Sequence, residues 1–196
     1  MFSKITSKII WKLVIVTHLF TISLFICEED LMASDLDRKW FVSLNLGSQM
    51  SGIKSEDFVY SNYSPLLRLS VGKWFSREMA LNVGYQGFYY YSISDDNRHS
   101  YNYFFGEAIF DVHYLFLGEN NERIWTAHIH AGSGYLNNKS TGQPNIIATT
   151  TSISNNFKIA DNLCISLTTS AIMGWNIYQG DEDILPGVAL GISYRF

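Results

Sequence analysis

The carboxy-terminal stretch, residues 186–196, limits the fold more than any other part of the sequence. In an extended chain, alternate side chains point to opposite faces. One face of this stretch carries only large apolar side chains: Val188, Leu190, Ile192, Tyr194 and Phe196. The other face carries glycine, alanine, serine and arginine. This alternation predicts a β-strand that turns a hydrophobic face, ending in two aromatic rings, toward an apolar environment.

The same alternation recurs upstream, from Trp40 onward. Seven further segments show it, over about residues 39–48, 65–75, 79–91, 101–116, 123–135, 146–158 and 163–175. The polar connections between the eight segments are alternately long and short, and the segments are long enough for tilted strands to cross a bilayer. We therefore predict an all-β fold, an eight-stranded antiparallel up-and-down transmembrane β-barrel. A secreted β-sandwich is the alternative, but it needs a second sheet to cover the apolar faces.

The composition agrees with a chain rich in strands. Aromatic residues make up 15% of the chain and charged residues 16%, and 14 glycines accompany only 3 prolines. Such a composition suits an all-β protein with aromatic surfaces. The formal net charge of -4, without a concentrated basic face, argues against a nucleic-acid partner.

The amino terminus has the pattern of a secretory signal. Lysines precede a mainly apolar run over residues 13–27, which is shorter than the roughly 20 residues of a membrane-spanning helix. We expect a signal peptide over residues 1–34, cleaved near Ala33 or Ser34, and an outer-membrane β-barrel over residues 35–196. Removal of the signal peptide leaves one cysteine in the mature chain.

Two alternatives for the amino terminus stay open. Cys27 can be a lipidated amino terminus, with the acidic residues 28–30 exposed after it. The segment can also remain uncleaved as a signal anchor.

Aromatic residues gather at the ends of the expected strands. One set falls at the ends joined by short turns: Trp40, Trp74, Phe75, Phe116, Trp125, Phe157 and Phe196. The other set falls at the ends joined by long loops: Tyr89, Tyr91, Tyr101, Tyr103, Tyr135 and Trp175. Because amphipathic rings prefer the lipid headgroup zone, these sets predict two aromatic girdles.

Ionisable side chains fall on the face opposite the apolar one. They are Arg68, Glu107, Asp111, His113, His128, His130 and Arg195. A charge on the lipid face is costly, so we expect these side chains to point into the barrel. An eight-stranded interior is just wide enough to be filled by side chains, which predicts a lumen polar network whose members pair with one another.

The sequence carries no motif that requires a cofactor, and we expect neither a cofactor nor a metal. A metal site at His128 and His130 would need a further ligand, such as His113 or Asp111, from the neighbouring strand. Glycine-rich phosphate loops, zinc-type cysteine spacings and nucleophile elbows are missing from the sequence.

The closing strand resembles the terminal strand of Gram-negative outer-membrane β-barrels, which the barrel-assembly machinery reads. That resemblance implies an assembly signal at Leu190, Ile192, Tyr194 and Phe196. Over residues 39–196 the layout resembles the OmpA/OmpX-type family of small eight-stranded barrels, here without the peptidoglycan-binding domain of its longer members. The resemblance implies an outer membrane of a Gram-negative-type cell, with both termini periplasmic. The implied partners are outer-membrane lipid and, during biogenesis, the assembly machinery.

For function we expect a non-enzymatic, integral outer-membrane protein. A side-chain-filled lumen suits a role in envelope structure, in surface recognition or as a membrane subunit of a larger complex. The candidate surface-recognition loop follows the first strand and includes Phe58, Tyr60 and Tyr63, where a protein or surface ligand would bind.

Two alternatives to this function are a narrow pore and a lipid A-modifying hydrolase barrel. The hydrolase resembles small barrels that deacylate lipid A with a serine nucleophile and a histidine base. In that family His and Ser lie two positions apart on a strand. Here His130 stands where the serine should follow His128, and Ser133 points to the opposite face.

Overall fold

A computed structural model describes residues 40–51, 63–92, 97–117, 124–138, 145–175, 177 and 182–196. The predicted signal peptide, its cleavage site and Cys27 lie outside these residues. The described chain belongs to one compact unit, residues 38–196.

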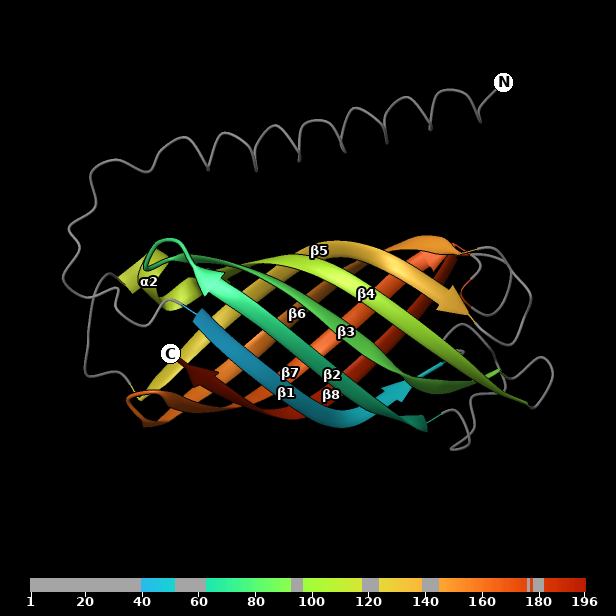
Figure 1. The fold of residues 1–196 in the computed structure, drawn as a ribbon, viewed down its shortest axis with the longest axis horizontal. Coiled ribbons are helices and arrows are strands. Elements are labelled where there is room, and N and C mark those ends of the chain that lie inside the picture. The colour runs from blue at the N-terminus through green and yellow to red at the C-terminus, as the bar shows by residue number, and fades with distance from the viewer. Residues whose placement is uncertain are drawn as a thin grey trace, which may run out of the picture. The chain divides into compact units, whose positions relative to one another are not determined.

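Eight antiparallel strands form a closed barrel in which each strand pairs with its neighbours in the sequence (Figure 1). The strands are β1 (Trp40–Met50), β2 (Tyr63–Trp74), β3 (Met79–Ser92), β4 (Asn97–Asp111), β5 (Trp125–Asn138), β6 (Ile146–Ala160), β7 (Leu163–Trp175) and β8 (Glu182–Arg195). The predicted fold and strand order are confirmed. Among the described residues, no helix has the length and hydropathy needed to cross a bilayer.

The barrel closes where the first and last strands meet. Leu44 pairs with Ile192 and Leu46 with Leu190, and the backbones of Trp40 and Phe196 exchange two hydrogen bonds. This pairing removes both free edges of the sheet, which is necessary where no water can satisfy backbone groups. We call this end of the barrel, with residues 75–78 and 161–162, the termini end. The opposite end, where β1 and β3 finish, is the loop end.

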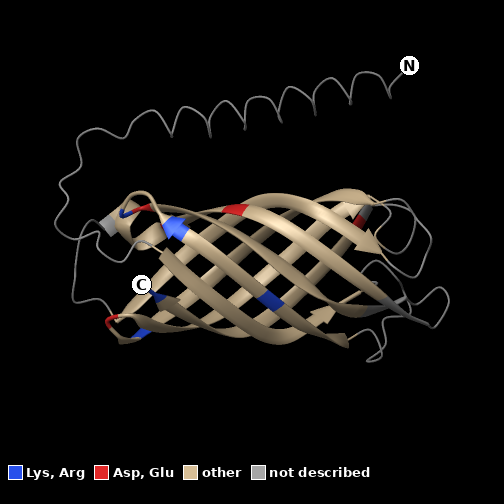
Figure 2. Ribbon diagram, viewed as in Figure 1, with Lys and Arg blue, Asp and Glu red and all other residues tan. Residues whose placement is uncertain are grey.

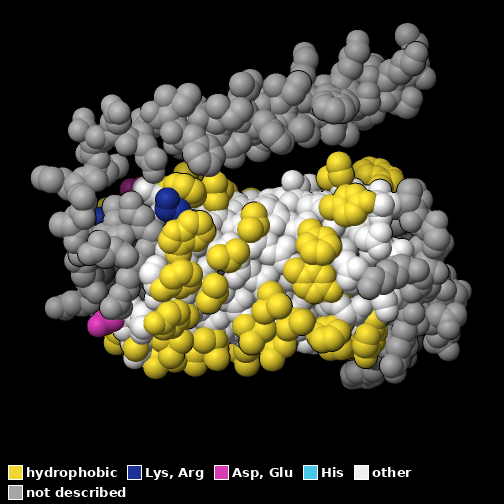
Figure 3. Space-filling view, viewed as in Figure 1, with side chains coloured by type: hydrophobic (Ala, Val, Ile, Leu, Met, Phe, Trp, Pro, Cys, Tyr) yellow, Lys and Arg dark blue, Asp and Glu magenta, His cyan; other side chains and the backbone are white. Residues whose placement is uncertain are grey.

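The outer surface is an apolar belt. Leu46, Val83, Ile153 and Leu190 are each more than half exposed, although none is polar. Figure 3 shows such hydrophobic side chains spread over the visible face of the barrel. Figure 2 shows charged residues mainly near the barrel ends. An exposed apolar belt of this extent is expected for a surface covered by lipid acyl chains.

Strand β4 begins and ends earlier than predicted. The sequence pattern suggested a strand to residue 116, but β4 ends at Asp111 and a short helix, α2 (Val112–Leu117), follows it. Phe110 pairs with Met79, the first residue of β3, so residues beyond Asp111 have no β3 partner to extend the sheet. Asp111 Oδ1 accepts the backbone N–H of Tyr114, which caps the start of the helix.

Two hydrophobic clusters fill much of the lumen. The loop-end cluster consists of Tyr101, Tyr103, Phe105, Leu136, Ala148, Ile172, Ile177 and Leu185. The termini-end cluster consists of Phe41, Trp74, Ala80 and Ile109. Gly72 makes room for the second cluster, because a Cβ there would lie 2.3 Å from the Phe41 ring.

The aromatic girdles are only partly as predicted. Trp40, Trp125, Tyr135 and Trp175 face outward and are exposed. Three rings assigned to the girdles instead lie buried in the lumen: Trp74, Tyr101 and Tyr103. Side-chain parity explains the correction, because Tyr101 and Tyr103 alternate in step with Glu107, which also points inward.

Candidate functional site

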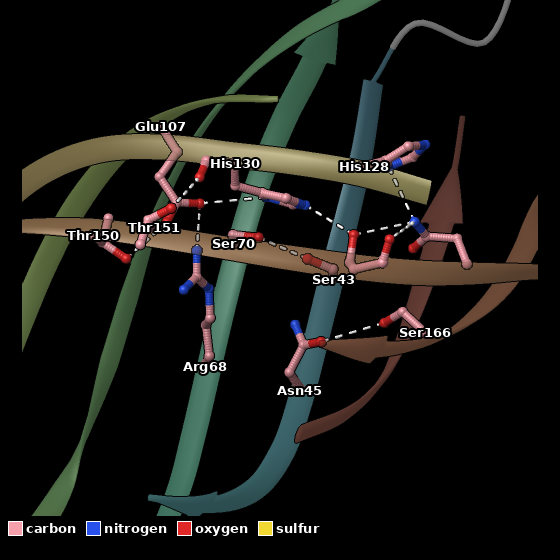
Figure 4. A network of polar contacts seen from close by, with 12 residues as sticks. Ser43, Asn45, Arg68, Ser70, Glu107, His128, His130, Thr150, Thr151 and Ser166 are labelled. Carbon is pink, nitrogen blue, oxygen red and sulfur yellow. Dashed lines mark hydrogen bonds and ion pairs between the residues drawn. The ribbon is translucent and has the colours of Figure 1, made fainter. Parts of the chain in front are cut away.

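The centre of the lumen holds a buried ion pair. Arg68 of β2 donates through Nη2 to Glu107 Oε2 on β4, and both residues are at least 95% buried (Figure 4). Thr150 Oγ1 donates to the other carboxylate oxygen over 3.2 Å. The Arg68 guanidinium also lies 4.1 Å from the centre of the Phe105 ring. Two desolvated charges are thus held by each other, by a hydroxyl and by an aromatic face.

A chain of polar contacts leads from Glu107 to His130 and the next strand. His130 Nδ1 lies 3.6 Å from Glu107 Oε2, and His130 Nε2 is hydrogen-bonded to Ser154 Oγ at 2.9 Å. Asn156 Nδ2 donates to Ser154 Oγ over 3.1 Å. Figure 4 shows Glu107 of β4 and His130 of β5 pointing toward each other.

The chain of contacts continues toward the termini end. Asn156 Nδ2 lies 3.1 Å from His128 Nδ1, and His128 Nε2 lies 3.6 Å from Asp111 Oδ2. Arg195 stands apart from this chain, with its guanidinium 5.4 Å from the centre of the Trp74 ring. We call the connected set Arg68, Glu107, Thr150, His130, Ser154, Asn156, His128 and Asp111 the lumen network.

A small cavity lies beside the lumen network. Its volume is about 60 Å³, and serines of five strands line it together with Arg68, His128 and His130. A buried water needs roughly 10–15 Å³ measured in this way, so the cavity has room for a few water molecules. It is too small for an acyl chain or a sugar.

The structure brings together five of the seven ionisable residues predicted for the lumen: Arg68, Glu107, Asp111, His128 and His130. Arg195 also lines the cavity, but it contacts Trp74 instead of the network. His113 is a correction. It lies on α2, where its ring packs edge-on against Trp125 at 4.3 Å and its Nδ1 accepts the Ala127 N–H.

Sequence reasoning missed the members of the network on β6, namely Thr150, Ser154 and Asn156. The signal was present in the strand register. His128 pairs with Ser154 and His130 with Ser152, so hydroxyl groups of β6 necessarily lie beside both imidazoles.

The candidate recognition residues fall mostly outside the described part of the chain. Phe58 and Tyr60 lie outside it. Tyr63 begins β2 at the loop end, pairs with Met50 and is 48% exposed.

Ser154, His130 and Glu107 have the connectivity of a serine-hydrolase triad. The hydroxyl contacts one imidazole nitrogen, and the carboxylate lies near the other. Two features oppose catalysis. Glu107 is already bound to Arg68, and the hydroxyl faces a cavity of about 60 Å³. Across the described segments, no group of three or more His, Cys, Asp or Glu side chains is placed to hold a metal ion.

No protein-family model matches the chain, and no curated protein matches its sequence. Solved structures do match. Neisserial surface protein A aligns with a TM-score of 0.62 and 12% identity, over 80% of this chain and 97% of its own. This chain folds as a small outer-membrane β-barrel. The amino-terminal barrel domain of Pseudomonas aeruginosa OprF aligns with a TM-score of 0.50 and 12% identity, over 79% of this chain and 97% of that domain.

The outer membrane enzyme PagL also matches, with a TM-score of 0.46 and 12% identity, over 80% of this chain and 99% of its own. At these identities the likeness extends to the fold alone. The fold is that of the OmpA/OmpX-type eight-stranded barrels. Together with the apolar belt, it supports a place for the chain in an outer membrane.

Proposed function

We propose that the chain is a non-enzymatic outer-membrane barrel that serves as a rigid scaffold in the envelope. One observation carries the proposal, namely that the lumen is filled by side chains that bind one another. Scaffolds of this kind act through the segments that join their strands. The role is therefore envelope structure, surface recognition or membership of a larger membrane complex.

Buried hydroxyl groups of the loop-end cluster support a scaffold because they already have partners. Tyr101 Oη donates to Gln49 Oε1 over 2.6 Å, and Tyr103 Oη donates to the carbonyl of Ala148 over 3.2 Å. Both hydroxyl groups are therefore already engaged within the protein instead of being available to bind a substrate. Buried hydrogen bonds of this kind rigidify a fold, which is what a scaffold requires.

The alternative function with a specific observation behind it is hydrolysis by Ser154, His130 and Glu107. Its test is incubation of the purified, folded protein with lipid A and, separately, with a fluorophosphonate that labels activated serines. We expect no released fatty acid and no labelling, because Glu107 is committed to Arg68 and the cavity excludes a lipid. Release or labelling by the wild type that Ser154→Ala and His130→Ala abolish would refute the non-enzymatic role.

We further propose that the termini end faces the periplasm. Support comes from two of the three connections at this end, residues 75–78 and 161–162, which are short turns as on the periplasmic side of outer-membrane barrels. The test is an Arg77→Cys variant in a Cys164→Ser background, because Arg77 is exposed on a termini-end turn. A membrane-impermeant maleimide should label this cysteine only after the outer membrane is permeabilised. Labelling in intact cells would reverse the orientation.

A further inference from the structure

An apolar groove lies on the outer surface over β1, β2 and β3. Val42, Leu69, Val71 and Val83 line it, and its volume is about 790 Å³. Tyr85 and Phe104 flank it, with their ring centroids 5.3 Å apart. A groove of this size falls within the range of small-molecule sites. Its apolar lining and its place in the belt suit an acyl chain.

One cation stands at the termini end of this groove. Lys73 is the next outward residue after Val71 on β2, and it pairs with Trp40 and Leu81. Its ammonium lies 5.7 Å from the centre of the Trp40 ring and 5.4 Å from that of Phe75. Aromatic rings at a barrel rim mark the level of the lipid headgroups, so the ammonium lies at phosphate height.

The charge of Lys73 has no acidic partner among the described residues, for its contacts there are with aromatic rings. A second lysine at the same end differs in this respect. Lys158 of β6 forms an ion pair with Asp161 at 2.9 Å, and it does not line the groove. Lys73 therefore lies beside an apolar groove without an acidic partner among the described residues, whereas the charge of Lys158 is already neutralised by Asp161. Lys158 serves as the control for Lys73.

We propose that this groove and Lys73 form a binding site for one phospholipid with an anionic headgroup. The acyl chains lie along Val71 and Val83, and the headgroup phosphate is held by the ammonium of Lys73. The site rests on the proposed outer-membrane role, because it requires a bilayer around the barrel. With the termini end periplasmic, the bound lipid belongs to the inner leaflet of that membrane.

The test is native mass spectrometry of the folded protein in a neutral detergent. The protein is titrated with phosphatidylglycerol and with phosphatidylcholine of the same chain length. The wild type should retain one phosphatidylglycerol in preference to phosphatidylcholine. Lys73→Gln should lower this preference roughly fivefold, the effect of one basic residue near an anionic surface. Lys73→Arg and the matched control Lys158→Gln should keep it.

Two further arms separate the lipid from other sources of binding. Val71→Trp fills the groove while leaving Lys73 in place, so it should reduce the retention of both lipids. Excess inorganic phosphate should not displace phosphatidylglycerol, because the acyl chains hold the lipid. Displacement by phosphate would show a simple anion site instead.

Equal retention of the two lipids by the wild type, or equal losses in Lys73→Gln and Lys158→Gln, would overturn the proposal. Heat-modifiable migration on a gel confirms that each variant is folded. The hydrolysis assay does not depend on lipid retention, so failure of the lipid site leaves the scaffold role standing.

Discussion

Glu107 is the residue at which the polar contacts of the lumen converge. Its carboxylate accepts hydrogen bonds from Arg68 and Thr150, and His130 lies beside it. Replacing Glu107 by Gln keeps the shape of the side chain but leaves the Arg68 guanidinium buried without a counter-charge. We expect the free energy of unfolding to fall by about 3–5 kcal/mol. Urea titration of the protein reconstituted in vesicles measures the loss.

The control removes both charges. An Arg68→Met/Glu107→Leu double variant leaves no uncompensated charge, so it should lose less stability than Glu107→Gln alone. A single variant as stable as the wild type would mean that the pair does not hold the lumen together.

Much of this site could be predicted at the level of single residues. Arg68, Glu107 and His130 alternate with apolar neighbours, and the cost of charge in lipid sends them inward. Their partners could not be assigned without the register, since the contact between His130 and Ser154 joins two strands. Trp74 was misplaced because an aromatic residue near a strand end fits either a girdle or a core.

Strand β8 illustrates what a single element requires. The outward rings at its end, Tyr194 and Phe196 just after the strand, are 45% and 53% exposed, and they stack with centroids 6.5 Å apart. They lie where β8 meets β1, and we expect the closing pair to depend on them. A Tyr194→Ser/Phe196→Ser variant should lose most of the heat-modifiable, membrane-inserted form.

The control for that variant is Ser193→Ala, which changes the same strand on its inward face. It should insert as the wild type does, measured by membrane fractionation followed by gels of heated and unheated samples. Normal insertion of the double variant would remove the assembly role assigned to these two residues.

The strands were predictable from the sequence. The alternation of apolar and polar residues and the cost of placing a charge in lipid both assign the apolar side chains to the outer face. The helix α2 was not predictable from the sequence. Val112, Tyr114 and Phe116 continue the alternation of β4, so local sequence favours more strand there. The sheet ends instead where β3 begins, and the Asp111 cap then allows a helical turn. The pairing of β4 with β3 therefore determines where the strand ends, and the alternation of residues alone does not reveal that pairing.

At the scale of the whole molecule, the central claim is that side chains block the lumen along the length of the barrel. Tyr101, Tyr103, Leu136 and Ile172 are each at most 1% exposed, which leaves the loop-end half of the lumen densely packed. Toward the other end, Trp74 and the lumen network occupy the interior, and a cavity of about 60 Å³ lies between them. The interior of an eight-stranded barrel is narrow enough for side chains to fill most of it.

Electrical recording across a planar bilayer tests this claim most directly. The purified, folded protein should give no discrete conductance steps. A Tyr101→Ala/Tyr103→Ala variant, which empties part of the loop-end cluster, is the control that shows whether the assay detects an opened lumen. Steps from that variant alone are the predicted result. Reproducible steps from the wild type would contradict the closed scaffold and favour a narrow pore.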